Sequence, residues 1–311
     1  MPTPLHHPPL PPFPDSGRTA PGMRTLPAEH DPVHGTARLG IEYAHRDGRS
    51  LVLHLLVPAG ERTGLPLLVH VQGSAWFEQE LGLNLPALAA FAARGYAVAT
   101  VAYRPSTVAP FPAQVLDLRA AVRFLHRHAG EFGLDPRRTA LWGDSSGGHT
   151  VVLAALTDGD PAFAHPEEDG HGPLGVRAVV DYYGPTDIAA MSAEPSAIDH
   201  DGPDSPEGRL IGGHRVGERP DLVAPTLAAT HVRPGAVLPP FLLVHGSRDR
   251  LVPFGQSVLL TEALQRAGHR VDLVRLEGAD HGGPPFWSGT VLDLVDGFLR
   301  THLAQDGDGP P

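Results

Sequence analysis

The sequence contains no cysteine. Disulfide bonds, a thiolate nucleophile and a metal site with cysteine ligands are therefore excluded, and folding does not depend on the redox state of the compartment. Hydrophobic residues make up 41% of the 311 residues and charged residues 19%. This composition is typical of a globular protein and not of a disordered or fibrous one.

Positive charge and long apolar runs are also scarce. Lysine and arginine together number 24 against 35 aspartates and glutamates, which gives a formal net charge of -11. Such a chain repels phosphate backbones and offers no basic stripe, so we expect no nucleic-acid partner. No apolar run approaches the ~18 residues that cross a bilayer, and the opening MPTPLHHPPLPPF lacks the basic and apolar regions of a secretory signal. We therefore expect a cytoplasmic protein that does not bind membranes.

Proline is distributed unevenly along the chain. Ten of the 34 prolines fall within residues 1–34, which have almost no periodic apolar pattern. We predict a disordered proline-rich tail over 1–34, a single domain over 35–304 and a second disordered tail over 305–311. Within the domain, a long insertion over about 186–238 is rich in proline and glycine, and we predict that it forms a lid over the strand ends.

Short runs of buried-type residues alternate with helix-length amphipathic segments through the domain. Two β-type runs joined by the turn pair Asp47-Gly48 come first and predict an antiparallel edge. Strands are then predicted over 65–71, 96–103, 139–143, 176–183, 240–246 and 269–276, and helices over 85–94, 113–129, 255–267, 288–303 and from 146 onward. This alternation implies a parallel sheet covered by helices on both faces. The predicted fold class is α/β, with a mostly parallel central sheet of about eight strands.

Residues 143–147 read Gly-Asp-Ser-Ser-Gly, a G-x-S-x-G motif directly between a predicted strand and a predicted helix. In that setting the serine sits on a sharp turn, and the glycines leave room where a Cβ would collide with neighbouring elements. Ser145 is therefore the predicted nucleophile. The helix that follows presents free amides and its positive end to a developing oxyanion, with the Ser146 amide as the natural donor. Two alternatives stay open: Ser145 only caps the helix, or Ser146 is the nucleophile.

A serine hydroxyl needs a neutral imidazole to take its proton and a carboxylate to orient that imidazole. Asp249 lies just past the carboxyl end of a buried strand, and His281 follows in a glycine-bounded loop after one more helix and strand. Their order after the serine is the order of hydrolases with this motif. We predict His281 as the general base and Asp249 as the orienting acid. The alternatives are His149, His245 and His70 for the base and Asp187, Asp280 and Asp144 for the acid.

Several segments within residues 65–285 also carry a family resemblance. They are VQGSAW, AYRPS, FPAQVLDLRAAVRFL, GDSSGGH, YYGPTD, PPFLLVHGSRDRLVPFGQS and GADHGG. With these segments the chain resembles the esterase and lipase branch of the α/β-hydrolases, closest to the acetylxylan/feruloyl esterase-like (BD-FAE-like) group and the hormone-sensitive-lipase-like carboxylesterases. The resemblance implies the α/β-hydrolase fold with a cap insertion, and a triad at Ser145, Asp249 and His281.

The loop after the first predicted parallel strand is where such enzymes supply further oxyanion amides. Members of the group show His-Gly-Gly-Gly-Trp where this chain has Gln-Gly-Ser-Ala-Trp over residues 72–76. Gly73 and Trp76 are retained, so the resemblance implies donors at about Ser74, with Gly73 and Ala75 beside it. Side chains at two positions that are usually glycine predict a reshaped acyl pocket and not a lost activity. A plain strand-to-helix loop is the alternative.

Aromatic side chains near the strand ends are predicted to line the substrate pocket, with core or lid packing as the equal alternative. They are Trp76, Phe77, Tyr103, Phe286 and Trp287. By resemblance, the predicted activity is hydrolysis of small to medium carboxylic esters through an acyl-serine intermediate. Amide or peptide hydrolysis, acyl transfer or cyclisation by the same triad, and a non-catalytic binding protein of the same fold remain alternatives.

The predicted partner is a small-molecule ester, and a homodimer is left open. We expect no cofactor and no metal, because nothing fixes ligand geometry in the one stretch rich in histidine and acid, which is better explained as a solvated loop. Its residues are His165, Glu167, Glu168, Asp169 and His171.

Overall fold

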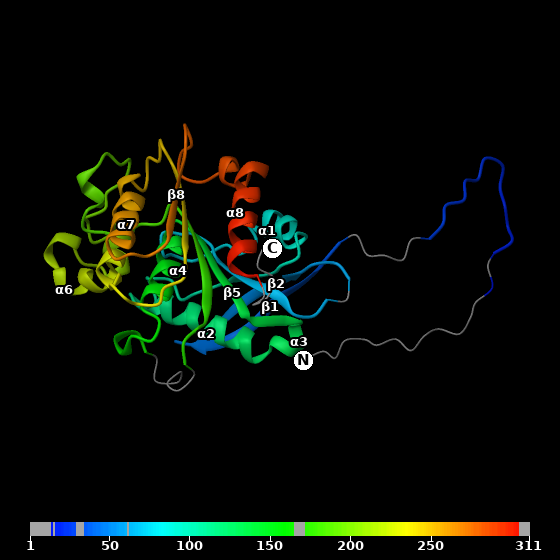
Figure 1. The fold of residues 1–311 in the computed structure, drawn as a ribbon, viewed down its shortest axis with the longest axis horizontal. Coiled ribbons are helices and arrows are strands. Elements are labelled where there is room, and N and C mark those ends of the chain that lie inside the picture. The colour runs from blue at the N-terminus through cyan, green and yellow to red at the C-terminus, as the bar shows by residue number, and fades with distance from the viewer. Residues whose placement is uncertain (1–13, 15, 29–33, 61, 165–171, 305–311) are drawn as a thin grey trace. The chain divides into compact units, whose positions relative to one another are not determined.

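The predicted strands assemble into a single sheet. The structure is a computed structural model that describes residues 14, 16–28, 34–60, 62–164 and 172–304. Met1–Asp31 and Pro32–Pro311 form two separate compact units, and the described part of the first, residues 14 and 16–28, contains neither helix nor strand. The sheet and its helices belong to the second unit (Figure 1).

The sheet has eight strands in the order β1-β2-β4-β3-β5-β6-β7-β8. The strands are β1 (Thr36–Arg46), β2 (Arg49–Val57), β3 (Leu65–Val71), β4 (Ala97–Val101), β5 (Leu134–Asp144), β6 (Val176–Tyr182), β7 (Phe241–Gly246) and β8 (Val271–Leu276). β2 pairs antiparallel with both β1 and β4, and every pairing from β4 across to β8 is parallel. The predicted mostly parallel sheet with an antiparallel edge is confirmed.

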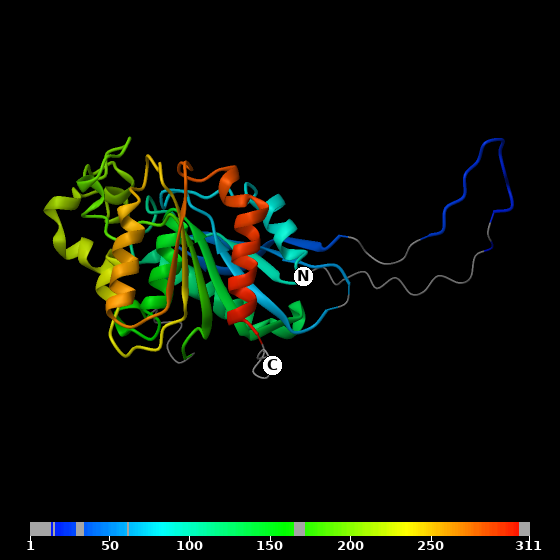
Figure 2. The same cartoon turned by 45° about the horizontal axis from the view of Figure 1, so that its top comes forward.

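Helices cover both faces of this sheet, as Figure 2 shows for α8 in red and α7 in orange on opposite sides. They are α1 (Leu85–Ala92), α2 (Ala113–Arg127), α3 (Ala129–Phe132), α4 (Ser146–Leu156), α7 (Gly255–Arg266) and α8 (Gly289–His302). On one face Leu118, Val152 and Leu260 from α2, α4 and α7 pack in one apolar core. On the other, Phe91 from α1 and Val295 from α8 belong to a second core. Burying both faces explains why the central strands are almost continuously apolar.

Residues 186–238, here named the cap segment, contain only short helices. These are α5 (Pro206–Leu210), α6 (Pro220–Val223) and several single turns of 3-10 helix. Ile188, Leu210 and Val223 of the cap segment pack around the indole of Trp76 in a small apolar cluster of their own. Gln256 Oε1 on α7 accepts hydrogen bonds from two amides at the start of the segment, at 2.8 and 2.7 Å. The cap segment is therefore fixed both to the loop after β3 and to α7.

The strand directions bring three loops to one edge of the sheet. Ser145 follows β5, Asp249 comes three residues after β7, and His281 lies in the loop after β8. Because β5, β6, β7 and β8 run parallel, their carboxyl ends share this edge, which is where sheets of this kind build sites.

Candidate active site

Ser145 occupies a strained turn between β5 and α4. Its backbone has φ 52° and ψ -126°, a conformation that residues with a Cβ adopt rarely. The flanking glycines make the turn possible. A Cβ on Gly143 would lie 2.3 Å from Gly147 O, and a Cβ on Gly147 would lie 2.0 Å from Val71 O. The Ser145 amide is held by a 2.8 Å hydrogen bond to Tyr182 O, so the hydroxyl is presented from a fixed backbone.

The structure brings the side chains of Ser145, Asp249 and His281 together. His281 Nε2 lies 3.0 Å from Ser145 Oγ, and His281 Nδ1 lies 2.7 Å from Asp249 Oδ2. An ionised carboxylate only accepts hydrogen bonds, so Nδ1 carries the ring proton and Nε2 is left to accept from the serine hydroxyl. This is the tautomer in which the imidazole can remove a proton from Ser145.

Asp249 is held as a carboxylate by donors on every side. Its Oδ1 accepts hydrogen bonds from the amides of Leu251 and Val252 at 2.9 and 2.8 Å, and His245 Nε2 lies 3.2 Å from Oδ2. Burial raises the pKa of Asp249, but the hydrogen bonds and charges of His245 and His281 outweigh burial and hold that pKa well below its usual range. A charged acid at neutral pH is what orients and stabilises an imidazolium.

The loop that carries His281 is fixed by a second aspartate and by an aromatic ring. Asp280 Oδ1 accepts a 2.8 Å hydrogen bond from the His281 amide, and Asp280 Oδ2 lies 2.5 Å from Arg250 Nε. The His281 ring stands edge-on to Tyr183 at 4.6 Å between centroids. The imidazole is therefore positioned by packing as well as by its hydrogen bonds.

The loop after β3 does not present all of the predicted oxyanion amides to a substrate. The Ser74 amide donates to Ser146 Oγ at 2.9 Å, and the Gly73 amide donates to Asp144 Oδ2 at 3.2 Å. Both amides have acceptors inside the protein because the nucleophile motif carries polar side chains on either side of Ser145. The other two predicted donors are the amides of Ala75 and Ser146. Within the described residues, the structure shows no protein acceptor for either of them.

Two residues of this loop adopt backbone conformations that favour glycine. Ala75 has φ 55° and Trp76 has φ 58°. Left-handed conformations cost a residue with a Cβ roughly 1 kcal/mol or more, so surrounding contacts must hold the loop in place. Trp76 supplies one of them, because its buried indole Nε1 donates to His149 Nδ1 at 3.3 Å.

Ser145 and His281 open into a cavity of about 340 Å³. The loop after β3 and Tyr183 form part of its wall. The remaining wall includes side chains from the cap segment and from the residues that follow the acid, namely Ile198, His200, Pro206, Glu207, Leu251 and Val252. The cavity is thus mostly apolar, with two polar cap residues.

Of the five aromatic residues predicted for the pocket, only Trp76 lines this cavity. Phe286 is fully buried against Tyr183, and Trp287 packs on Trp142, because the turn after His281 folds back onto the face covered by α8. Phe77 belongs to the loop after β3, and Tyr103 contacts that loop. The hydroxyl of Tyr103 is 2.9 Å from Ser74 Oγ, and the half-buried Phe77 accepts a hydrogen bond from the same Oγ through its carbonyl. None of these four residues is among those that line the cavity.

A family model, BD-FAE, matches residues 53–264. The chain belongs to the BD-FAE family. The resemblance to α/β-hydrolases of the esterase branch is thereby confirmed, and solved structures of similar fold are also esterases. The truncated form of a carbohydrate esterase from gut microbiota superposes with a TM-score of 0.76 at 26% identity, covering 89% of this chain and 99% of that one. The propionate-bound esterase Est2 of Thermogutta terrifontis gives a TM-score of 0.69 at 28% identity, with 87% and 97% covered.

Curated relatives of this BD-FAE chain are longer proteins. Esterase LipC of Mycobacterium tuberculosis is 30% identical over 234 residues, which cover 75% of this chain and 54% of LipC. The chain spans about half the length of the curated relatives that it matches first.

Three other histidines near the site of this BD-FAE chain have structural partners. His149 is buried, accepts from Trp76 and lies 2.8 Å from the cap carbonyl of Thr226 through Nε2, and burial lowers its pKa to about 4. His70 Nε2 lies 3.3 Å from Asp144 Oδ1 beneath the loop after β3. His245 contacts Asp249 as described, so sequence reasoning missed a second donor to the acid. The only sequence signal for it is a histidine four positions before the aspartate at the end of a buried strand.

The alternative acids also lie away from the His281 ring. Asp187 Oδ1 accepts from the amides of Ala189 and Ala190 and so stabilises a turn at the start of the cap segment. Asp144 accepts from Gly73, and Asp280 contacts the backbone of His281 and not its imidazole.

Neither a metal cluster nor a membrane-spanning helix is found in the residues that the structure describes. No group of three or more histidine, aspartate or glutamate side chains there could hold a metal ion. Within the same residues, none of the helices combines the length and the apolar character that crossing a bilayer requires. The stretch weighed as a metal site, residues 165–171, lies outside the described residues.

A buried aspartate that lies against α4 makes the stability of this BD-FAE chain depend on pH. Burial raises the pKa of Asp181 from 3.8 to about 7, and the charge of Asp144 adds to this effect, although a hydrogen bond from the Gly184 amide opposes it. The folded protein therefore holds a proton that the unfolded chain releases above pH 3.8. The contribution of Asp181 to stability is complete below that pH and is lost as pH rises towards 7.

We expect Asp181→Asn to remove this loss, because an asparagine keeps the acceptor for Gly184 and carries no charge. The free energy of unfolding of the variant minus that of the wild type should rise by about 3 kcal/mol between pH 4 and pH 7. Denaturant unfolding at a series of pH values measures it. Asp272→Asn, at an exposed position on β8, is the matched control and should give a flat difference. An equally flat difference for Asp181→Asn would show that this carboxyl is charged in the fold.

Proposed function

We propose that this chain is a serine carboxylesterase that hydrolyses small to medium carboxylic esters through an acyl-Ser145 intermediate. One observation carries the proposal. His281 Nε2 is 3.0 Å from Ser145 Oγ while Nδ1 is 2.7 Å from a buried carboxylate, at the wall of a 340 Å³ cavity. A hydroxyl, a base and an orienting acid in hydrogen-bond contact form the unit that activates a serine.

The mechanism follows from these contacts. Ser145 Oγ attacks the ester carbonyl carbon while its proton passes to His281 Nε2, which leaves a tetrahedral oxyanion. The amide of Ser146, at the positive end of α4, and the amide of Ala75 stabilise that oxyanion. His281 then gives its proton to the departing alcohol oxygen as the carbon–oxygen bond breaks. Water repeats the sequence on the acyl-enzyme and releases the acid.

Asp249 has the role of orienting and charge-stabilising partner in this scheme. It accepts from Nδ1 of His281 throughout and so stabilises the imidazolium that forms when Ser145 loses its proton. Its own proton affinity is too low for it to take that proton, because four donors already bind the carboxylate.

The relatives support ester hydrolysis as the reaction. LipC and Est2 are named esterases, and Est2 has been solved with propionate and with butyrate bound. A cavity of 340 Å³ lined by small and branched apolar side chains suits an acyl chain of that size.

We expect the rate of p-nitrophenyl ester hydrolysis to be highest for acetyl to butyryl esters and to fall for octanoyl esters, because a cavity of about 340 Å³ encloses a short acyl chain better than a long one. Comparing kcat/KM across acetyl, butyryl, hexanoyl and octanoyl esters measures this preference. A clear maximum at octanoyl would contradict the short-chain assignment but leave the esterase assignment standing.

A fluorophosphonate probe tests the nucleophile directly. We expect stoichiometric labelling of the folded protein, with the adduct mapped by mass spectrometry to Ser145 and not to Ser146. Folded protein that remains unlabelled would favour a binding protein and overturn the proposal. Product analysis with an added alcohol or amine then separates hydrolysis from acyl transfer, because transfer would give the new ester or amide as the main product.

A further inference from the structure

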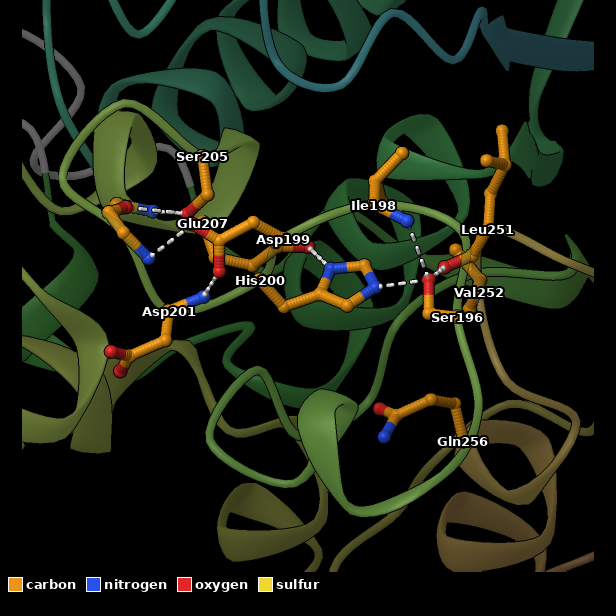
Figure 3. A network of polar contacts seen from close by, with 12 residues as sticks. Ser196, Ile198, Asp199, His200, Asp201, Ser205, Glu207, Leu251, Val252 and Gln256 are labelled. Atoms are coloured by element: carbon orange, nitrogen blue, oxygen red, sulfur yellow. Dashed lines mark hydrogen bonds and ion pairs between the residues drawn. The ribbon is translucent and has the colours of Figure 1, made fainter.

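The cap segment contributes a buried acid and base to the wall of the cavity. Figure 3 shows the polar contacts around this pair. His200 and Glu207 are each only 2% exposed, and both line the cavity that contains Ser145 and His281. His200 Nδ1 lies 2.9 Å from Glu207 Oε1, and His200 Nε2 lies 2.8 Å from Ser196 Oγ. Neither residue has a part in the ester chemistry proposed above.

Ser196 contacts the other ring nitrogen of His200 and has further hydrogen-bond partners. Ser196 has one hydroxyl proton, and its Oγ lies 3.1 Å from Leu251 O and 3.3 Å from Arg250 O. The Ile198 amide also donates to this Oγ at 3.3 Å, so Ser196 holds the His200 ring on the side opposite Glu207. A proton lies between His200 Nδ1 and Glu207 Oε1, because two lone pairs could not form this 2.9 Å hydrogen bond.

Glu207 is left with one buried oxygen that has no partner. Oε1 is bound by His200, whereas Oε2 has no hydrogen bond within the part of the chain that the structure describes. A buried carboxylate oxygen without a donor is costly, and native proteins seldom retain one without a reason. The neighbouring cavity residues Ile198, Pro206 and Val252 are apolar, so the protein offers no donor in its place.

We propose that Glu207 Oε2 is a subsite for a hydroxyl group on the ester substrate, which rests on the proposed esterase function and narrows its substrate class. The substrate hydroxyl donates to Oε2 and completes the hydrogen bonding of the carboxylate. A substrate with a methyl group at the same position leaves Oε2 unpaired and is disfavoured.

Two pairs of isosteric esters test the subsite on either side of the scissile bond. On the acyl side they are ethyl 3-hydroxybutyrate and ethyl 3-methylbutyrate, and on the alcohol side 2-hydroxyethyl butyrate and propyl butyrate. For each pair the measured quantity is kcat/KM for the hydroxyl ester divided by kcat/KM for the methyl ester. We expect this ratio in the wild type to be well above one for at least one pair.

Substituting Glu207 should abolish that discrimination. In Glu207→Leu we expect the ratio to fall about 10- to 100-fold, the value of a hydrogen bond to a charged group. Glu207→Gln keeps an oxygen at the Oε1 position for His200 and so protects folding, but its NH2 group then takes the place of Oε2. We expect a fall of about threefold or more, because the charge-assisted acceptor at that position is lost. Glu218→Gln, an exposed glutamate of the same cap segment, is the matched control and should leave the ratio unchanged.

The outcomes separate this inference from the esterase proposal. Suppose that the wild type hydrolyses the methyl esters, and that for both ester pairs the ratio is unchanged in Glu207→Leu and in Glu207→Gln. The subsite is then refuted and the esterase proposal stands. If the folded wild type hydrolyses none of the four, the esterase proposal fails. In that case the subsite is tested by binding: calorimetry gives the dissociation constants of the same esters for the wild type and for Glu207→Gln. Equal constants for the hydroxyl and methyl ester of each pair would refute the subsite.

Discussion

Ser145→Ala is expected to lower kcat/KM for p-nitrophenyl butyrate by about four to six powers of ten. The alanine keeps the Cβ, so the strained turn at φ 52° and the two glycines around it are not disturbed. What disappears is the atom that attacks the carbonyl, and His281 then has no hydroxyl to activate. The residual rate comes from binding and from the oxyanion amides acting on water.

Two controls keep this result interpretable. The thermal midpoint of the variant should stay within a few degrees of the wild type, because only one partly buried hydroxyl is lost. Ser50→Ala, at an exposed position on β2, should retain the wild-type rate. A folded Ser145→Ala protein that hydrolyses the ester at near wild-type rates would refute the whole catalytic assignment.

Asp249→Asn is expected to lower kcat by about four powers of ten while leaving the fold intact. The contacts of Asp249 determine how the asparagine sits. The amides of Leu251 and Val252 both donate to Oδ1, so the NH2 group cannot occupy that position and must take the place of Oδ2. Oδ2 is the atom that faces Nδ1 of His281 at 2.7 Å.

The NH2 group then donates to Nδ1 and forces the ring proton of His281 onto Nε2. A protonated Nε2 cannot accept the proton of Ser145, so the base is held in the wrong tautomer. His245 Nε2 faces the same NH2 group, so it loses Asp249 as an acceptor and keeps only the Val252 carbonyl, at 3.0 Å. Rates of p-nitrophenyl butyrate hydrolysis measure the effect, with the circular dichroism spectrum as the check on folding.

Asp280→Asn is the matched comparison for this variant, because Asp280 contacts the His281 backbone and not its ring. We expect its effect on kcat to remain below about tenfold, since the tautomer of His281 does not depend on it. If Asp280→Asn were the more damaging of the two, the orienting acid would have been assigned to the wrong aspartate.

The fold could be predicted from the sequence nearly element by element. Strands over 65–71, 176–183 and 240–246 match β3, β6 and β7 to within one residue, because apolar runs bounded by turn residues record burial on both faces of a parallel sheet. β5 begins five residues earlier than predicted, since its first residues, Leu134–Arg138, include an aspartate, a proline and two arginines and so lack the apolar run that marks a buried strand. The position of the G-x-S-x-G motif between a strand and a helix could also be predicted, because the steric limits of a sharp turn require glycine at fixed spacing.

The side-chain contacts within the site could not be predicted from the sequence in the same way. The sequence gives no sign that Ser74 donates to Ser146 Oγ, that His245 contacts Asp249 together with His281, or that four of the five predicted pocket aromatics do not line the cavity. The pair His200 and Glu207 lies in a segment with no regular periodicity, where only the position of the short helices decides what faces inward.

The sequence by itself therefore determined the α/β class, the strand order along the chain and the residue types able to act as nucleophile, acid and base. Tertiary structure alone decided which amides remain free for an oxyanion, which side chains line the cavity and which carboxylate oxygen is left unpaired. The physical reason is that strands and sharp turns depend on neighbours within a few residues, which a sequence pattern records. Hydrogen-bond partners distant in sequence depend on how whole elements pack, and no local pattern records that.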